Sequence, residues 1–207
     1  MKLLILGGTG PTGRHLIDQA ICAGDTVAVL ARKPAALAEL ARQVTLFHGD
    51  ATVESDISAA MTGQDAVVSA LGAGKSVVSD MFPRAAAVVI DSMQKCNVSR
   101  LVWLSSFGVG ETFREASMTQ KMIYRTLLRS IYPQKAIADS LIRASDRDWT
   151  VVYPVALTHK PAVGSFRVGD HLPMQGNASI SRADVAAFML DAARGSEWIG
   201  RSPIISS

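Results

Sequence analysis

The stretch that decides the fold is KLLILGGTGPTG, residues 2–13 of the 207-residue chain. An apolar run leads into a glycine-rich turn, and a helical pattern follows the turn. In this setting Gly7 permits the tight turn, Gly10 lets the backbone approach a pyrophosphate, and Gly13 lets the helix pack closely on the strand. The helix N-terminus presents unpaired N–H groups and partial positive charge to the phosphates. The stretch therefore predicts a dinucleotide-binding site.

Short apolar runs alternate with helical patterns along the rest of the chain. Strands are expected at residues 3–6, 26–30, 44–47, 65–71, 100–105 and 149–153, and helices at about 12–23, 34–42 and 81–96, with one or two more between 115 and 144. Continuous Val, Leu and Ile runs without polar alternation are typical of parallel strands covered on both faces. The order predicts an α/β fold, a single-domain doubly wound parallel sheet (Rossmann fold) spanning residues 1–207.

The pattern loosens after Pro154. Residues 156–178 are rich in Gly and Pro, which indicates loops with one short strand at 165–168. Regular structure returns at Ser181, where the sequence S-R-A-D is a capping-box pattern that begins a helix running to about residue 193. A final strand is expected near 203–205. We interpret residues 154–180 as a small, loop-rich C-terminal substrate region.

The composition is that of a globular protein with a small-molecule ligand. Hydrophobic residues make up 48% and charged residues 19%, and the formal net charge is +3. The charges are scattered, so we expect no nucleic-acid or membrane partner. Cys22 and Cys96 lack metal-ligand spacing, so we expect two buried free thiols and no metal site. We also expect a cytoplasmic location, because the apolar run before Gly7 is too short for a signal peptide, and a monomer or small homo-oligomer.

The end of the second strand selects the dinucleotide. NAD-binding proteins usually place an Asp or Glu there, which accepts a hydrogen bond from the ribose 2′-hydroxyl. This chain has Arg32 and Lys33 instead, and cations suit a 2′-phosphate, so NADP(H) is favoured over NAD(H). A solvated strand end is the alternative. Asp50, after the third strand, is a candidate acceptor for the adenine amino group, or a helix N-cap, or both.

At this point the sequence resembles a known family. The segments GGTGPTG, VLARKP, GDA, GQDAVVSALG, LVWLSSFG and SLIRASDRDWTVVYP are similar to atypical short-chain dehydrogenases. The greatest likeness is to the flavin reductase/biliverdin-IXβ reductase group and its NmrA-like and NADH-flavin-reductase relatives. The resemblance implies an NAD(P)H-dependent reductase.

The resemblance also implies residue roles along the cofactor. They are Gly7, Thr9, Gly10, Pro11 and Thr12 on the pyrophosphate; Arg32 on the 2′-phosphate; Asp50 and Ala51 beside adenine; Leu71, Gly72, Leu104 and Ser106 along the ribose and nicotinamide; and Pro154, Val155, Ala156 and Leu157 flanking the nicotinamide ring. Gly13, Lys33 and Lys135 complete the predicted cofactor-binding set.

One departure from the family pattern bears on the chemistry. Ordinary members use Tyr-x-x-x-Lys, in which the tyrosine is the general acid. Here the lysine position falls on Lys135, the tyrosine position holds Ile131, and Pro133 interrupts a helical register between them. Flavin and biliverdin reductases carry histidine at the positions of Lys135 and Ala156, and this chain lacks both histidines.

Hydride transfer to a conjugated acceptor can proceed without a placed tyrosine, because the acceptor spreads the charge. We therefore predict an NADPH-dependent reductase of flavin, quinone or linear tetrapyrrole, with FMN or FAD as candidate substrates. Ser106 and Lys135 are the candidate catalytic residues; a strand-end serine and a solvated helix lysine are the alternatives. A non-catalytic, NmrA-like NADP(H) sensor is the second hypothesis, and the missing Tyr-x-x-x-Lys pair disfavours a sugar-nucleotide epimerase or dehydratase.

Overall fold

The fold is built on a mostly parallel sheet. The computed structural model describes residues 1–72, 80–115, 130–172 and 178–207. Within these residues eight strands lie in the order β3 (Thr45–His48), β2 (Thr26–Ala31), β1 (Lys2–Leu6), β4 (Ala66–Ser69), β5 (Arg100–Leu104), β6 (Asp148–Pro154), β10 (Ile204–Ser206) and β8 (Arg167–Gly169). Every neighbouring pair is parallel except β10 and β8. The doubly wound α/β fold predicted from the sequence is confirmed.

The strand order reverses direction at β1. The chain runs outward from β1 through β2 to β3, returns to β4 on the other side of β1, and runs outward again through β5 to β6. The connections leaving β1 and β4 therefore diverge and leave a crevice beyond the carboxyl ends of these two strands. This crevice is where ligands bind in open α/β sheets.

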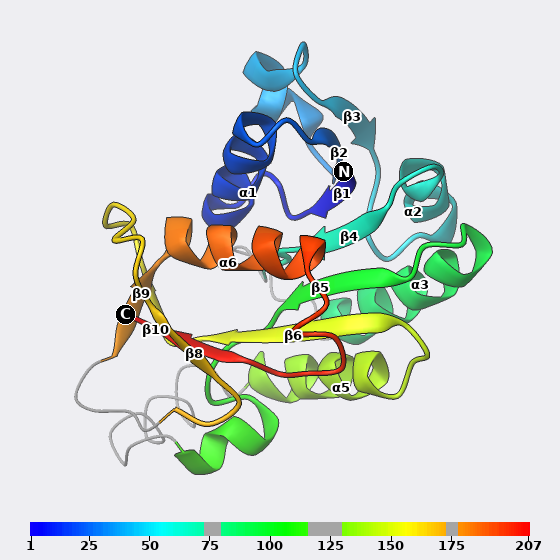
Figure 1. Cartoon of the computed structure of the whole chain (residues 1–207). Coiled ribbons are helices and arrows are strands. Elements are labelled where there is room, and N and C mark those ends of the chain that lie inside the picture. The colour runs from blue at the N-terminus through cyan, green and yellow to red at the C-terminus, as the bar shows by residue number, and fades with distance from the viewer. Residues whose placement is uncertain (73–79, 116–129, 173–177) are drawn as a thin grey trace.

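Helices cover both faces of the sheet (Figure 1). On one face α1 (Pro11–Cys22) packs against α6 (Arg182–Arg194), and on the other α3 (Met81–Lys95) lies between α2 (Glu54–Met61) and α5 (Tyr132–Arg143). The two-sided cover explains the continuous apolar strands: Leu3 to Leu6 are entirely buried, as are Val67 and Val68 of β4. A second, two-stranded parallel sheet joins β7 (Ala156–Thr158) to β9 (Ser179–Ser181).

Several local expectations differ from the structure. Residues 34–42 were expected to form an α-helix, but η1 (Pro34–Leu40) is a 3₁₀-helix interrupted at Leu37, where φ is −124° and the side chain is completely buried. The backbone at Leu37 departs from helical geometry, and its side chain is buried in the core. The strand expected at 165–168 is found at 167–169, where it runs antiparallel at the sheet edge. Helix α2 and strands β7 and β9 were not predicted, because each is short and has few apolar positions.

The exposure of the two cysteines and the distribution of surface charges can also be compared with the sequence-based expectations. Cys22 is exposed, so the expectation that it is buried is wrong, because it is the last residue of α1, on its solvent side. Cys96 is half-buried and packs against the core.

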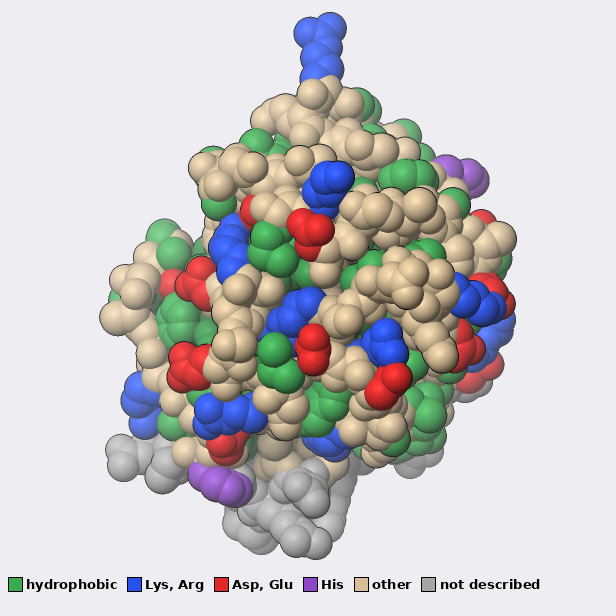
Figure 2. Space-filling view, turned by 45° about the vertical axis from the view of Figure 1, so that its right-hand side comes forward, with side chains coloured by type: hydrophobic (Ala, Val, Ile, Leu, Met, Phe, Trp, Pro, Cys, Tyr) green, Lys and Arg blue, Asp and Glu red, His purple; other side chains and the backbone are tan. Residues whose placement is uncertain are grey.

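On the face shown in Figure 2, Lys and Arg side chains alternate with Asp and Glu. A second 3₁₀-helix, η2 (Gly110–Glu115), follows β5.

Candidate cofactor site and active site

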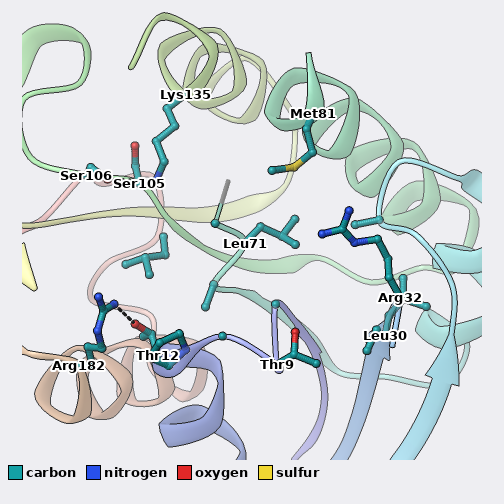
Figure 3. A pocket seen from close by; sticks show the side chains of 18 of the residues that line it. Thr9, Thr12, Leu30, Arg32, Leu71, Met81, Ser105, Ser106, Lys135 and Arg182 are labelled. Atoms are coloured by element: carbon teal, nitrogen blue, oxygen red, sulfur yellow. Dashed lines mark hydrogen bonds between the residues drawn. The ribbon is translucent and has the colours of Figure 1, made fainter. Parts of the chain in front are cut away.

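A pocket of about 420 Å³ lies beyond the carboxyl ends of the central strands. Its walls come from the loop between β1 and α1 and from the residues that end β2, β3, β4 and β5, closed by single side chains of α3, α5, β7 and α6. Because these ends converge at the reversal of strand order, the pocket occupies the crevice that the topology creates. Figure 3 shows the side chains that line it.

The glycine loop forms the floor of the pocket. Gly7 has φ +78°, and a Cβ there would lie 2.5 Å from the carbonyl oxygen of Ala70. A Cβ on Gly13 would overlap the carbonyl group of Gly7, so helix α1 can approach β1 only with glycine at this position. Gly10 is the N-cap residue of α1, and Pro11 follows at the first helical position, where no backbone N–H is needed. The bare backbone and helix N-terminus fit a pyrophosphate.

Arg32 and Lys33, the two cations after β2, lie in different surroundings. Arg32 lines the pocket, and Figure 3 shows its guanidinium group extending across one end. Lys33 is exposed at the start of η1 and is not part of the pocket lining. The geometry thus keeps Arg32 as the candidate for a 2′-phosphate, whereas Lys33 fits the alternative of a solvated strand end.

Asp50 lines the same end of the pocket as Arg32. Its Oδ1 accepts hydrogen bonds from the backbone N–H of Thr52 at 2.9 Å and from the Thr52 hydroxyl at 2.8 Å. Burial acts to raise the pKa of Asp50, but these hydrogen bonds and the charge of Arg32 outweigh it, so the pKa is lowered. The N-cap of α2 is Val53, so Asp50 holds a local turn and is not the helix cap. Its ionised carboxylate keeps lone pairs for an amino group.

Lys135 and Ser106 meet at the opposite end of the pocket. Lys135 Nζ donates a hydrogen bond to Ser106 Oγ at 3.1 Å and lies 5.1 Å from the centre of the Phe82 ring. The lysine side chain is buried, and this burial lowers its pKa to about 8, against an opposing effect of Asp139. The alternative of a solvated helix lysine is therefore wrong. Pro133, expected to interrupt this region, lies in the first turn of α5, where proline is tolerated.

A buried hydrogen-bond network lies next to Lys135, and the sequence did not reveal it. Asp139, one helical turn after Lys135, accepts from Ser105 Oγ at 2.6 Å and from the Tyr153 hydroxyl at 2.8 Å. Arg143, one turn further, donates to the Tyr153 hydroxyl. Burial raises the pKa of Asp139, against the hydrogen bonds of Ser105 and Tyr153. Spacing of four residues on α5 is the signal that would have grouped these side chains.

The remaining predicted positions divide between the pocket and its surroundings. Thr9, Thr12, Ala51, Leu71, Gly72, Leu104 and Leu157 line the pocket, whereas Pro154, Val155 and Ala156 lie outside its lining. Pro154 and Val155 are buried at the end of β6, and Ala156 is exposed at the start of β7. Met81 and Arg182 also line the pocket and were not predicted. Arg182 is the first residue of α6, more than 150 residues from the loop it faces, so local patterns could not place it there.

Two properties of the described residues bear on other classes of function. No helix among them is long and apolar enough to cross a membrane. No group of three or more His, Cys, Asp or Glu side chains in residues 1–72, 80–115, 130–172 and 178–207 is arranged to hold a metal ion.

Comparisons with known proteins identify the family. A profile described as NAD(P)H-binding matches residues 7–195. The UPF0659 protein YMR090W of Saccharomyces cerevisiae is 28% identical, over 92% of this chain and 86% of that protein. The uncharacterised sugar epimerase YhfK of Bacillus subtilis is 25% identical, over 90% of this chain and 85% of that protein.

Solved structures show the same fold. The anaerobilin reductase ChuY of Escherichia coli O157:H7 superposes with a TM-score of 0.85 at 24% identity, covering 99% of this chain and 96% of that chain. A short-chain dehydrogenase/reductase of Veillonella parvula, solved in complex with NADP, gives a TM-score of 0.84 at 17% identity, covering 100% and 94%. The profile match extends over most of the chain, from the glycine loop to the end of α6. The chain therefore belongs to the NAD(P)H-binding family of Rossmann proteins, related in fold to the atypical short-chain dehydrogenases.

Proposed function

We propose that this protein is an NADPH-dependent reductase that delivers hydride to a planar, conjugated acceptor: a flavin, a quinone or a linear tetrapyrrole. The observation that carries the proposal is the pair formed by Lys135 and Ser106, a buried cation hydrogen-bonded to a hydroxyl in the pocket that the glycine loop also lines. NADPH, when bound, supplies the hydride. The protein's part is to hold the acceptor against the nicotinamide and to provide a proton.

The tyrosines of the described residues are engaged away from the pocket. The Tyr132 hydroxyl donates to the backbone oxygen of Phe107 at 3.1 Å, and the Tyr153 hydroxyl donates to Asp139. Neither residue is part of the pocket lining. A phenolic general acid of the usual short-chain dehydrogenase kind is therefore not available from these two residues, and the acid has to come from elsewhere.

Lys135 has the properties of that acid. With a pKa of about 8, it is mostly protonated at neutral pH yet gives up its proton more readily than an exposed lysine. It donates to Ser106 Oγ, which leaves the serine's own hydrogen free to point into the pocket. In the proposed step the acceptor receives hydride, the Ser106 proton passes to the acceptor, and Lys135 replaces that proton. Water then reprotonates Lys135.

The choice of acceptor rests on this chemistry. A conjugated acceptor spreads the charge of the incoming hydride, so one modest acid at the pocket edge suffices. ChuY, which shares this fold, is named as an anaerobilin reductase, and we therefore include linear tetrapyrroles in the proposed class. FMN and FAD remain candidate substrates on the same grounds.

The test is NADPH oxidation followed by absorbance, with FMN, a quinone and biliverdin supplied as separate acceptors. We expect turnover with at least one acceptor, faster with NADPH than with NADH. Absence of turnover on all three, together with tight binding of both NADPH and NADP⁺, would contradict the reductase and favour a protein that senses the redox state of the cofactor. Binding of NADP⁺ and NADPH is measured separately, so an inactive preparation is distinguished from a sensor.

A further inference from the structure

Arg182 joins two parts of the molecule that are distant in the sequence. It is the first residue of α6, and its Nη1 donates a hydrogen bond of 3.2 Å to Oγ1 of Thr12, the second residue of α1. Figure 3 shows the guanidinium group rising beside Thr12 at the pocket wall, away from Arg32 at the other end. Both Arg182 and Thr12 line the pocket. The arginine therefore stands next to the N-terminus of α1.

Within the part of the chain that the structure describes, the charge of Arg182 has no partner of opposite sign. Among the ion pairs of the described residues none includes Arg182, and its Nε is buried without a hydrogen bond. The nearby carboxylate of Asp184 is occupied by the backbone N–H groups of Val163 and Gly164 and by the Ser181 hydroxyl. Burial lowers the pKa of Arg182, but an arginine remains charged at neutral pH. A partly buried cation held only by a hydroxyl is suited to an anion.

The position of Arg182 next to Thr12 indicates which anion it would bind. The glycine loop and the N-terminus of α1 offer a pyrophosphate N–H groups and about half a positive charge, whereas the pyrophosphate carries two negative charges. Arg32 lies at the far end of the pocket, where the third strand also ends, and so is placed for a different phosphate. Arg14, the cation in the first turn of α1, is paired with Glu39 and does not line the pocket, whereas Arg182 does. Arg182 is therefore the cation placed beside Thr12 for the pyrophosphate.

We propose that Arg182 binds the pyrophosphate of the nicotinamide dinucleotide and so completes, from α6, a phosphate site that α1 begins. This inference needs the dinucleotide to bind, but it does not need the acceptor to be reduced. The hydroxyl of Thr12 holds the guanidinium ready before the cofactor arrives. Since Arg182 directly follows β9, cofactor binding also ties the C-terminal substrate region to the glycine loop.

The experiment measures dissociation constants for three probes in the absence of any acceptor: NADPH, NADH and 2′-AMP. NADPH carries both the pyrophosphate and the 2′-phosphate, NADH lacks the 2′-phosphate, and 2′-AMP lacks the pyrophosphate. We expect Arg182→Gln to weaken NADPH and NADH by the same factor, about tenfold or more, and to change 2′-AMP less than twofold. Arg182→Lys should recover part of the loss, because it restores the charge without the planar fork.

Arg32→Gln is the matched control at the other end of the pocket. We expect it to weaken NADPH and 2′-AMP strongly and to change NADH little, the reverse of the Arg182→Gln pattern. Unchanged binding of NADPH and NADH in Arg182→Gln would overturn the proposal, and an equal loss of affinity for 2′-AMP would do the same. Thermal unfolding of each variant shows whether the fold is intact. Because no turnover is measured in the binding arms, they can support this inference even if the reductase hypothesis fails.

Discussion

At the scale of single residues, Lys135 is the side chain whose surroundings best fit the proposed role of a catalytic acid. Its ammonium group is buried between the Phe82 ring of α3 and the Ser106 hydroxyl that follows β5, with Asp139 one turn away on α5. A buried charge without a close carboxylate destabilises a fold, so an apolar side chain of similar size would be tolerated or favoured there. Because a buried lysine at this position lowers the stability of the fold, its presence favours a functional role for Lys135.

Replacing Lys135 with Met separates function from stability. We expect kcat to fall roughly 100-fold or more, the lower end of what general acids contribute, while thermal stability stays equal or rises. Lys160→Met, which removes an exposed lysine from a loop, should change neither. The measurements are NADPH oxidation with the best acceptor and calorimetric unfolding of both variants. A drop in melting temperature parallel to the loss of activity would instead assign Lys135 a structural role.

The pH dependence of the reaction tests the same residue in the wild-type protein. Burial lowers the pKa of Lys135 to about 8, so the protonated, proton-donating form is lost as the pH rises through 8, and kcat should fall there. Asp139 acts to raise this pKa, so Asp139→Asn should move the fall to lower pH. Arg143, Ser106 and Phe82 are unchanged in that variant. A profile that does not move in Asp139→Asn, or that keeps its fall in Lys135→Met, would contradict the assignment.

Also at this scale, local rules predicted some site residues and missed others. Gly7 and Gly13 could be predicted because local backbone geometry requires glycine at both positions: Gly7 has φ +78°, and a Cβ on Gly13 would overlap the backbone of Gly7. The burial of Lys135 depends on Phe82, which lies 53 positions earlier in the chain and on another helix. Arg182 depends in the same way on Thr12. Contacts between residues so distant in the sequence cannot be predicted until the order and packing of the elements are known.

At the scale of elements, α6 holds the loop that contains Val163 and Gly164 through Asp184. Ser181 caps the helix by accepting from the Asp184 N–H at 2.9 Å, as the capping-box pattern predicts. The carboxylate of Asp184 accepts in turn from the backbone N–H groups of Val163 and Gly164, each at 3.0 Å. One acidic residue thus links the helix start to a loop twenty residues earlier. The sequence indicated the cap, but not the loop that it anchors.

Changing Asp184 to Ala should therefore release this loop. Two backbone donors lose their acceptor, and we expect the free energy of unfolding to fall by about 1–3 kcal/mol. Hydrogen exchange at Val163 and Gly164 should accelerate more than exchange at the centre of α6. The control is Asp191→Ala on the same helix, whose side chain is 79% exposed, with only a small change expected. Equal loss of stability in both variants would argue that helix propensity, and not the loop anchor, is what Asp184 provides.

The elements that differ from expectation are those that sequence periodicity resolves least. Helix α2 has only eight residues, three of them buried, which is too short to show a clear 3.6-residue pattern. Strand β8 pairs antiparallel with β10, which lies more than thirty residues later in the chain, so its direction has no local signal. By contrast, β1 and β5 are buried on both faces, and their continuous apolar runs predict them well.

At the scale of the whole molecule, the pocket is assembled from both halves of the doubly wound sheet. The glycine loop, Arg32 and Asp50 come from the half that contains β1, β2 and β3, whereas Ser106 and Lys135 come from the half that contains β5 and β6. A dinucleotide that fills this pocket contacts segments from residue 7 to residue 182. Since these contacts exist only in the folded chain, ligand binding and folding are coupled.

Cofactor should consequently stabilise the whole chain, and the 2′-phosphate should matter. At a concentration 100 times its Kd, NADPH should add about 2.7 kcal/mol to the free energy of unfolding, which raises the melting temperature by roughly 5–10 °C for a domain of this size. NADH at the same concentration should raise it less, because Arg32 then has no phosphate to bind. Differential scanning calorimetry measures both shifts, and Arg32→Gln should bring the NADPH shift down to that of NADH. Equal shifts for the two cofactors in the wild-type protein would contradict the preference for NADP(H) while leaving the dinucleotide site itself intact.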